Sequence, residues 1–462
     1  MHLPTTLARA LGATLLLGTL ATPLTTFAAD DAATTTYITP DQAASDTTSS
    51  ATADPNTTAA TNTSALTRAT DASTTAALTS ASGANTTAAT TTSATDATTT
   101  AATTTSASTI TTANLTLPTL NADHAYGMNL FVWGHPDTTG RDLGTVKQAG
   151  FTWQKTLFTW RDIEGKCKGC FDWTEADRVA KATTAAGIKL LVRVDFEPDW
   201  ARADHAHNGH PDNLQDYADF VRAVADRYKP GSPYGTVSAI EVWNEPNLQR
   251  EWGDPISQQS AATYVQMLKL AYAATKSVSP STLVVTAGLS PTGWSDDTAR
   301  PDDQYLQWMF DAGLSGNYDV LGLHGNSQVS DPTAAPGSVP GLSDGSFYFR
   351  RVEQLHQVQV TNGDAAKPIW LLEFGWTADA VHPAYSWFAV TEDQKAKNIM
   401  AAFQYARANW PWLGTMFVWT LPDPSWNKDR EEYWWAIANP DGTPRPALTS
   451  ILQAAVAKQL PS

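Results

Sequence analysis

The sequence predicts an α/β fold, a (β/α)8 (TIM) barrel, in the part of the chain that follows residue 120. Short apolar runs alternate there with longer amphipathic runs, a pattern typical of successive βα units around a parallel sheet. Eight such pairs occupy about 340 residues, which suits one barrel with elaborated loops. The alternative with the same alternation is an open doubly wound sheet, but no Gly-rich phosphate loop follows any predicted strand.

The eight predicted strands are short and rich in apolar residues, and each is followed by a predicted helix. We expect the strands at residues 126–132, 152–158, 189–195, 239–244, 283–287, 320–324, 369–373 and 415–419. We expect the helices near residues 141–149, 174–186, 213–228, 257–277, 303–312, 346–358, 391–408 and 446–458. Gly150 and Gly187 follow two of the helices as C-caps, and Thr391 begins an N-terminal capping pattern.

Composition divides the 462 residues into three segments. Residues 1–29 have the features of a signal peptide, with Arg9 before an apolar run and small residues at the end; an uncleaved anchor is the alternative. Residues 30–120 are rich in Thr, Ala and Ser and have too few apolar residues to offset the entropy of ordering. We expect them to form a disordered linker or stalk, glycosylated or bare. Residues 121–462 form the predicted barrel domain.

These segments predict a secreted or cell-surface protein, with the stalk as a tether in the second case. The net charge of -16 and the absence of any basic run argue against a nucleic-acid partner, because phosphate binding requires a basic patch. An acidic surface favours solubility, and we expect a monomer. The 18 Trp residues suit a neutral carbohydrate partner, because flat indole rings can stack on the apolar faces of sugars.

The chain has only two cysteines, Cys167 and Cys170, separated by two residues. In an exported protein, a disulfide that closes a small loop is the first interpretation. A thioredoxin-like redox pair would be expected at a helix start after a strand. A zinc site would need further ligands close by, and none is evident.

Two of the predicted strands give way to a loop at a glutamate, and these residues point to the chemistry. Glu245 follows the fourth strand and Glu373 ends the seventh. Active sites of (β/α)8 barrels form at the C-terminal ends of the strands, and these two strands can face each other across the barrel mouth. Two carboxyl groups about 5–5.5 Å apart are what a retaining glycosidase requires. The alternative is that either glutamate only pairs with a buried arginine.

The two motifs, Trp243-Asn-Glu-Pro-Asn247 and Trp370-Leu-Leu-Glu-Phe-Gly-Trp376, resemble those of the clan-A (β/α)8 retaining glycoside hydrolases. Within the clan, the chain is most similar to the family 39 group and related bacterial exopolysaccharide hydrolases, and residues 158–164, 198–201 and 439–446 fit the same pattern. The resemblance covers roughly residues 125–458. It implies that Glu245 is the acid/base, that Glu373 is the nucleophile and that Asn244 hydrogen-bonds the sugar 2-hydroxyl. This chemistry requires no metal and no cofactor.

Other residues at the predicted barrel mouth are candidates for substrate binding. His324 ends the sixth strand, where it could hydrogen-bond Glu373 or touch the sugar; the alternative is a histidine with ordinary structural contacts. Trp419 ends the eighth strand and is the first candidate for a stacking platform. Trp160 is the next, and Trp200 and Trp133 follow, although a single Trp is more often part of a core.

Three charged residues on the predicted strands have a structural interpretation. Arg193 and Glu241 lie on neighbouring strands, and we expect them to form a buried pair inside the barrel. Lys155 on the second strand can join this pair. These residues would support the site rather than act on substrate.

The sequence therefore predicts a secreted retaining glycoside hydrolase that cleaves β-glycosidic bonds in an oligo- or polysaccharide, with endo action on a polymer favoured. One alternative is a non-catalytic carbohydrate-binding surface protein, which would tolerate loss of either glutamate. Another is a transglycosylase, which would use the same two residues. The sugar and the linkage depend on the loops around the mouth, which the fold does not specify.

Overall fold

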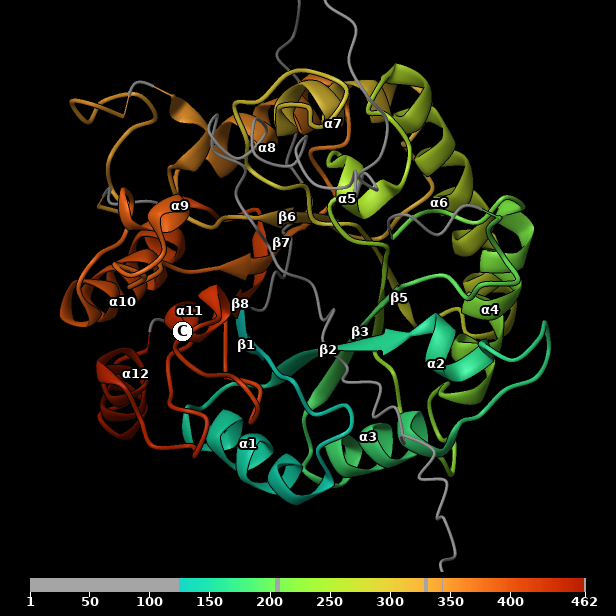
Figure 1. Cartoon of the computed structure of the whole chain (residues 1–462), viewed down its shortest axis with the longest axis horizontal. Coiled ribbons are helices and arrows are strands. Elements are labelled where there is room, and N and C mark those ends of the chain that lie inside the picture. The colour runs from blue at the N-terminus through green and yellow to red at the C-terminus, as the bar shows by residue number, and fades with distance from the viewer. Residues whose placement is uncertain (1–123, 204–207, 328–330, 343, 461–462) are drawn as a thin grey trace, which may run out of the picture. The chain divides into compact units, whose positions relative to one another are not determined.

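The computed structural model describes residues 124–203, 208–327, 331–342 and 344–460. The predicted signal peptide and stalk, residues 1–29 and 30–120, lie outside these ranges. Eight parallel strands form one sheet in the order β5-β4-β3-β2-β1-β8-β7-β6. Parallel bridges from Val285 to Val320 and from Leu289 to Leu323 join its two edges. The sheet therefore closes on itself, and the predicted (β/α)8 barrel is confirmed (Figure 1).

All eight predicted strands are present, with ends that differ by a few residues from the predicted ones. Nearly all strand residues are buried, because side chains fill the barrel interior on one face and helices cover the other. The strands are β1 (Ala125–Asn129), β2 (Trp153–Thr159), β3 (Lys189–Asp195), β4 (Ala239–Val242), β5 (Leu283–Thr286), β6 (Leu321–His324), β7 (Ile369–Phe374) and β8 (Leu413–Val418).

Helices surround the strands (Figure 1). The long ones match the eight predicted helices: α1 (Pro136–Gln148), α3 (Thr174–Ala185), α4 (Leu214–Arg227), α6 (Gln258–Val278), α7 (Asp302–Asp311), α8 (Arg351–Thr361), α10 (Glu392–Asn409) and α12 (Pro446–Val456). None of the helices described between residues 124 and 460 is long and apolar enough to cross a membrane.

Short helices interrupt the loops that follow several strands, and the sequence did not predict them. They are α2 (Trp160–Glu164), α5 (Gln249–Trp252), η1 (Gly345–Phe347), α9 (Pro383–Ser386) and α11 (Glu431–Trp435). A segment of three to five residues is too short to show a helical period, so only tertiary contacts can specify it.

The predicted caps are also present. Gly150 and Gly187 follow α1 and α3 with φ of 71° in both cases, the left-handed conformation that glycine adopts without a steric penalty. The Thr391 hydroxyl accepts a hydrogen bond from the backbone N–H of Gln394 at 3.1 Å. These caps fix the ends of helices that determine where the next strand begins.

The barrel interior has an apolar part and a charged part. The rings of Trp153 and Trp370 meet edge to face at 4.9 Å within a small cluster of buried apolar side chains inside the barrel. Lys155 follows Trp153 by two residues on the same face of β2. In the same way, Arg193 and Glu241 follow Leu191 of β3 and Ala239 of β4, which belong to the same cluster. The apolar cluster therefore fills the barrel below a layer of charged groups near the C-terminal ends of the strands.

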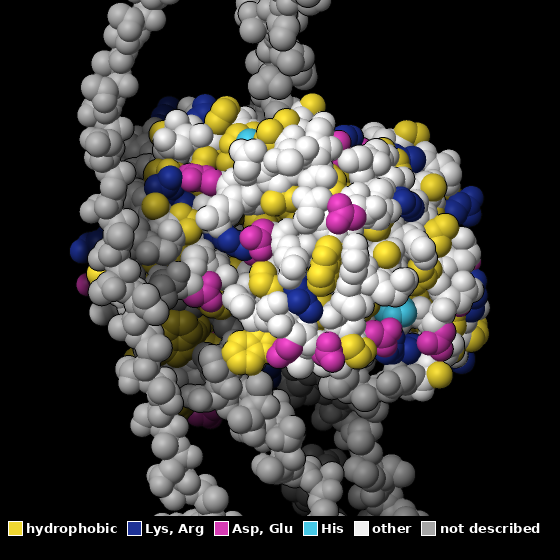
Figure 2. All heavy atoms as spheres, turned by 90° about the horizontal axis from the view of Figure 1, so that it is seen from above, with side chains coloured by type: hydrophobic (Ala, Val, Ile, Leu, Met, Phe, Trp, Pro, Cys, Tyr) yellow, Lys and Arg dark blue, Asp and Glu magenta, His cyan; other side chains and the backbone are white. Residues whose placement is uncertain are grey.

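On the outer surface, positive and negative side chains are interspersed over the face that Figure 2 shows, with hydrophobic side chains scattered among them. The excess of acidic residues is therefore not gathered into one patch on that face.

Candidate active site

Glu245 lies in a tight turn that follows β4. Trp243 and Glu245 have φ of 73° and 36°, a conformation that costs non-glycine residues on the order of 1–3 kcal/mol each. Tertiary contacts hold this backbone in place. The Trp243 indole N–H donates to the Glu251 carbonyl at 2.7 Å, and the Glu245 N–H donates to the Gly288 carbonyl at 3.1 Å. Strain of this kind is common at functional sites, where the surrounding structure fixes a side chain in one direction.

The Glu245 carboxylate is completely buried and contacts two basic side chains. Its Oε1 lies 2.9 Å from Nδ1 of His324, at the end of β6. Its Oε2 lies 3.3 Å from Nη2 of Arg250, in α5. Each carboxylate oxygen therefore has one nitrogen partner, and the carboxylate is held in one orientation.

The Glu373 carboxylate, on β7, is also completely buried. Its Oε1 lies 3.2 Å from Nζ of Lys155 and 3.7 Å from Nε2 of His324. The two ring nitrogens of His324 thus face the two glutamates, one each. This places both carboxylates on either side of one imidazole ring, although they come from β4 and β7.

The charges around Glu373 determine its protonation. Burial raises its pKa, but the positive charges of His324, Lys155 and Arg193 outweigh burial, and the net shift is downward. Glu373 is therefore ionised at neutral pH. The Lys155 ammonium is itself almost completely buried, and it also lies 2.9 Å from Oε2 of Glu241.

The expected pair of Arg193 with Glu241 is replaced by two other ion pairs. Arg193 Nε lies 2.9 Å from Oδ2 of Asp195 on its own strand, while Glu241 pairs with Lys155. Arg193 and Glu241 do lie opposite each other in the β3–β4 register. The ammonium group of Lys155, on β2, nevertheless reaches across to Glu241. Burial raises the pKa of Asp195 to about 7, and the charge of Arg193 only partly opposes this.

His324 makes its hydrogen bond to Glu245 rather than to Glu373, which was one of the alternatives considered from the sequence. Its contact with Glu373 is 3.7 Å long, too long for a hydrogen bond. Gly288, just after β5, makes the bond to Glu245 possible. A Cβ atom at Gly288 would lie 2.1 Å from Cδ2 of His324, so only glycine leaves room for the ring in this position.

Two asparagines near the carboxylates are buried: Asn244, predicted from its motif, and Asn326, two residues after His324. The Asn244 side chain hydrogen-bonds the Glu251 carboxylate, whereas the Asn326 amide has no hydrogen-bond partner among the described residues. A buried amide without a partner costs free energy, so Asn326 is a candidate for a bond to a ligand hydroxyl. Asn326 was not predicted from the sequence, and its position just after β6 was the available signal.

Of the four predicted tryptophan platforms, Trp419 follows β8, whose neighbour β7 carries Glu373. Its backbone N–H donates to the carbonyl of Phe374, the residue after Glu373, at 2.9 Å. Its side chain is nearly buried, in an aromatic cluster with Phe388 and Trp435.

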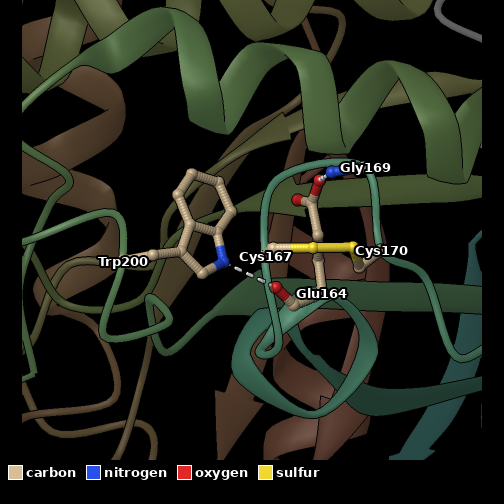
Figure 3. The surroundings of a disulfide bond; sticks show 5 residues. All are labelled: Glu164, Cys167, Gly169, Cys170 and Trp200. Carbon is tan, nitrogen blue, oxygen red and sulfur yellow. Dashed lines mark hydrogen bonds between the residues drawn. A yellow bond between two sulfur atoms is a disulfide. The ribbon is translucent and has the colours of Figure 1, made fainter.

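The other three tryptophans pack outside the carboxylate layer. Trp160 is completely buried and its ring stacks on Phe220 of α4 at 5.5 Å, so it belongs to the core between barrel and helices. Trp200 is bound to the end of α2, because its indole N–H donates to the Glu164 carbonyl at 2.6 Å (Figure 3). Trp133 packs against Phe158 at 5.6 Å. Trp160 is not part of the site that holds the glutamates, because its ring is buried against the side chains of α4.

The predicted disulfide between Cys167 and Cys170 is present. It closes a loop beside Glu164, whose carboxylate accepts a hydrogen bond from the Gly169 N–H at 2.5 Å (Figure 3). In the described part of the chain, no group of three or more His, Cys, Asp or Glu side chains is arranged to hold a metal ion.

Comparisons with known proteins show which proteins the chain resembles. Residues 112–311 match the family model described as Cellulase (glycosyl hydrolase family 5). Among solved structures, a family 39 glycoside hydrolase from Bacteroides cellulosilyticus WH2 is similar with a TM-score of 0.55 and 17% identity, over 72% of this chain and 64% of that one. The chain thus spans less than two thirds of that structure.

Another similar structure is GH5_18 from Streptomyces cattleya in complex with GlcNAc, with a TM-score of 0.53 and 16% identity over 73% of this chain and 80% of that one. The β-glycosidase BGL167 has a TM-score of 0.51 and 14% identity, over 74% of this chain and 98% of that one. At these identities the structures show the fold alone. No curated protein matches the chain.

The closed barrel carries one glutamate from β4 and one from β7 at the same ends of the strands, an arrangement that resembles that of the clan-A (β/α)8 retaining glycoside hydrolases. The family match, which covers residues 112–311 and so less than half of the chain, agrees with this resemblance.

Proposed function

We propose that this protein is a secreted enzyme that hydrolyses a β-linked oligo- or polysaccharide by double displacement, with Glu373 as nucleophile and Glu245 as acid/base. The observation that carries the proposal is the placement of both carboxylates against the two nitrogens of His324. Two carboxyl groups that face the two nitrogens of one imidazole ring are close enough to act on a single anomeric carbon.

In the first step, an oxygen of Glu373 attacks the anomeric carbon while the bond from that carbon to the leaving oxygen breaks. Glu245 gives its proton to the leaving oxygen, so the product leaves as a neutral alcohol. The lowered pKa of Glu373 suits this role, because a nucleophile must be ionised.

In the second step, water attacks the glycosylated anomeric carbon and releases Glu373. Glu245, now a carboxylate, takes the proton from that water and returns to its starting state. Glycosylation of Glu373 removes its negative charge from the site before this step. Arg250 Nη2, 3.3 Å from Glu245 Oε2, holds that oxygen in place.

The remaining residues of the site orient the substrate and the carboxylates. His324 is a positioning residue, because its hydrogen bond fixes Glu245 and its other nitrogen faces Glu373. The amide of Asn326 offers donors and acceptors for sugar hydroxyls. Trp419 supplies an apolar surface beside β7.

The matched family model is described as a cellulase, so β-1,4-glucan is the first polymer to test, followed by β-1,4-mannan and β-1,4-xylan. Secretion is proposed from residues 1–29, and surface tethering through residues 30–120 is the alternative destination.

Separate substitution of the two glutamates tests the assignment. With an aryl β-glycoside as substrate, Glu373→Ala should lower kcat at least about a thousandfold, because no covalent intermediate can form. Glu245→Ala should keep much more activity on a substrate with a good leaving group, which needs no proton, and added azide should restore turnover as a glycosyl azide. Glu353→Gln, on α8, is the control for removal of a glutamate charge. Activity of Glu373→Ala near that of the wild type would refute the nucleophile assignment.

A further inference from the structure

A cavity of about 520 Å³ lies on the outside of the barrel, away from the glutamates. Aromatic and charged side chains line it, among them Phe171, Trp173, Arg227, Lys229 and Tyr234. The last three lie between the end of α4 and the start of β4, whereas Glu245 follows the opposite end of β4. Its volume is within the range of roughly 300–1,000 Å³ that is typical of small-molecule sites.

Two of the aromatic rings in this cavity are unusually exposed. Phe171 is 36% exposed and Tyr234 is 38% exposed. Phe171 stacks on Trp173 at 4.9 Å, and the Trp173 ring lies parallel to Phe220 of α4 at 6.4 Å. The rings of α4 and the α2–α3 loop thus form one continuous aromatic surface that ends in solvent.

The loop that carries Phe171 is held rigidly. The Cys167–Cys170 disulfide closes it, and the Glu164 carboxylate accepts a hydrogen bond from the Gly169 N–H inside it (Figure 3). A loop that is already fixed loses little entropy when a ligand binds. The disulfide therefore holds the Phe171 side chain in place at the surface, a constraint that packing of the core does not need.

The charged groups of the cavity are paired. Arg227 lies 3.7 Å from the centre of the Tyr234 ring and pairs with Asp177 at 2.7 Å. Lys229 pairs with Asp226 at 2.9 Å. The cavity thus offers hydrogen-bond donors and acceptors beside aromatic faces, with little net charge. A neutral polyhydroxylated ligand fits this combination, because its C–H faces can stack on the rings and its hydroxyls can bond to the charged groups.

We propose that this cavity is a second carbohydrate-binding site, which holds a neutral polysaccharide chain remote from the two glutamates. The inference rests on the proposed function, since the bound polymer would be the enzyme's own substrate. Binding at a second site on the same molecule raises the effective concentration of polymer at the catalytic site.

Retention of the full chain on insoluble polysaccharide tests this inference. Phe171→Ala and Tyr234→Ala would each be introduced into the Glu373→Ala background, so that the polymer is not digested. The probes are β-1,4-glucan, β-1,4-mannan and β-1,4-xylan fibres. We expect each substitution to weaken retention at least about fivefold on a fibre that the background chain binds, as is typical for loss of an aromatic contact. Tyr272→Ala, a partly exposed aromatic on α6, is the matched control.

The same substitutions in the wild-type chain should leave kcat/KM for a small aryl β-glycoside within about twofold, because that substrate is too short to reach the cavity. Three results would overturn the inference. The first is undiminished retention of both variants, and the second is an equal loss of retention in Tyr272→Ala. The third is that the background chain is not retained on any of the three fibres. Tyr234 lies outside the disulfide loop, so its variant remains informative if Phe171→Ala unfolds. Failure of the proposed function would show separately, as turnover by Glu373→Ala.

Discussion

Lys155 provides a sharp test of how the site keeps its nucleophile ionised. Its ammonium lies 3.2 Å from Glu373 Oε1 and 2.9 Å from Glu241 Oε2, and all three side chains are buried. Two unit charges 3.2 Å apart attract each other by about 5 kcal/mol at an effective dielectric constant of about 20. One pKa unit corresponds to about 1.4 kcal/mol, so this charge is large enough to govern the protonation of Glu373.

We expect Lys155→Met to raise the pKa of Glu373, because the effect of burial is then opposed by one positive charge fewer. In the wild type, the lowered pKa keeps Glu373 ionised as the pH falls, and activity is lost only when the pH falls through that pKa. In the variant, protonation occurs at higher pH. The acidic limb of kcat/KM should therefore move upward by about one pH unit or more, while activity returns at higher pH.

The assay is the pH dependence of kcat/KM with an aryl β-glycoside. Lys189→Met removes an exposed lysine from the first position of β3 and should leave the acidic limb unchanged. Loss of one partner of a buried ion pair can cost about 3–5 kcal/mol of stability, so the double variant Lys155→Met with Glu241→Gln is the second arm. An unchanged acidic limb in both variants would refute the electrostatic account of the nucleophile.

Three further predictions concern other parts of the site. Gly288→Ala should lower kcat by about tenfold or more with a smaller change in KM, because the new Cβ displaces His324 from Glu245. Asn326→Ala should lower kcat/KM by about tenfold without lowering the melting temperature, because its amide has no hydrogen bond within the described part of the chain. The raised pKa of Asp195, about 7, gives stability that is present at low pH and lost as the pH rises through that value. Asp195→Asn should therefore reduce the fall in melting temperature between about pH 5 and pH 8; an equal fall in both proteins would contradict this.

Much of the fold was predictable from local sequence patterns. Alternating apolar runs identified all eight strands and all the long helices, because each element must present an apolar face to the same core. The caps at Gly150 and Thr391 were also predictable, because each depends only on the backbone of one turn. A left-handed φ favours glycine at Gly150, and a free backbone N–H at the helix start favours the Thr391 hydroxyl.

The partners of the charged residues were less predictable. Sequence placed Glu241 opposite Arg193, but three-dimensional packing brought the ammonium of Lys155 closer. For His324, a bond to Glu373 was one of the alternatives that the sequence left open, but the space beside Gly288 lets the ring reach Glu245 instead. Both outcomes depend on distances of an ångström or two between strands far apart in the chain, and these have no local sequence signal.

Trp160 illustrates a further limit. Its position after β2 predicted a place at the mouth, yet its ring turns toward Phe220 of α4. Position along a strand gives the end of the barrel at which a residue lies, whereas the helix packed beside it decides which way a large side chain points.

The most direct test of the account is to trap the covalent intermediate. The full chain would be incubated with a 2-deoxy-2-fluoro β-glycoside that carries a good leaving group, then digested and mapped by mass spectrometry. The account predicts one glycosyl adduct, carried by Glu373. An adduct on Glu245 or on another side chain, or steady turnover without any adduct, would contradict it.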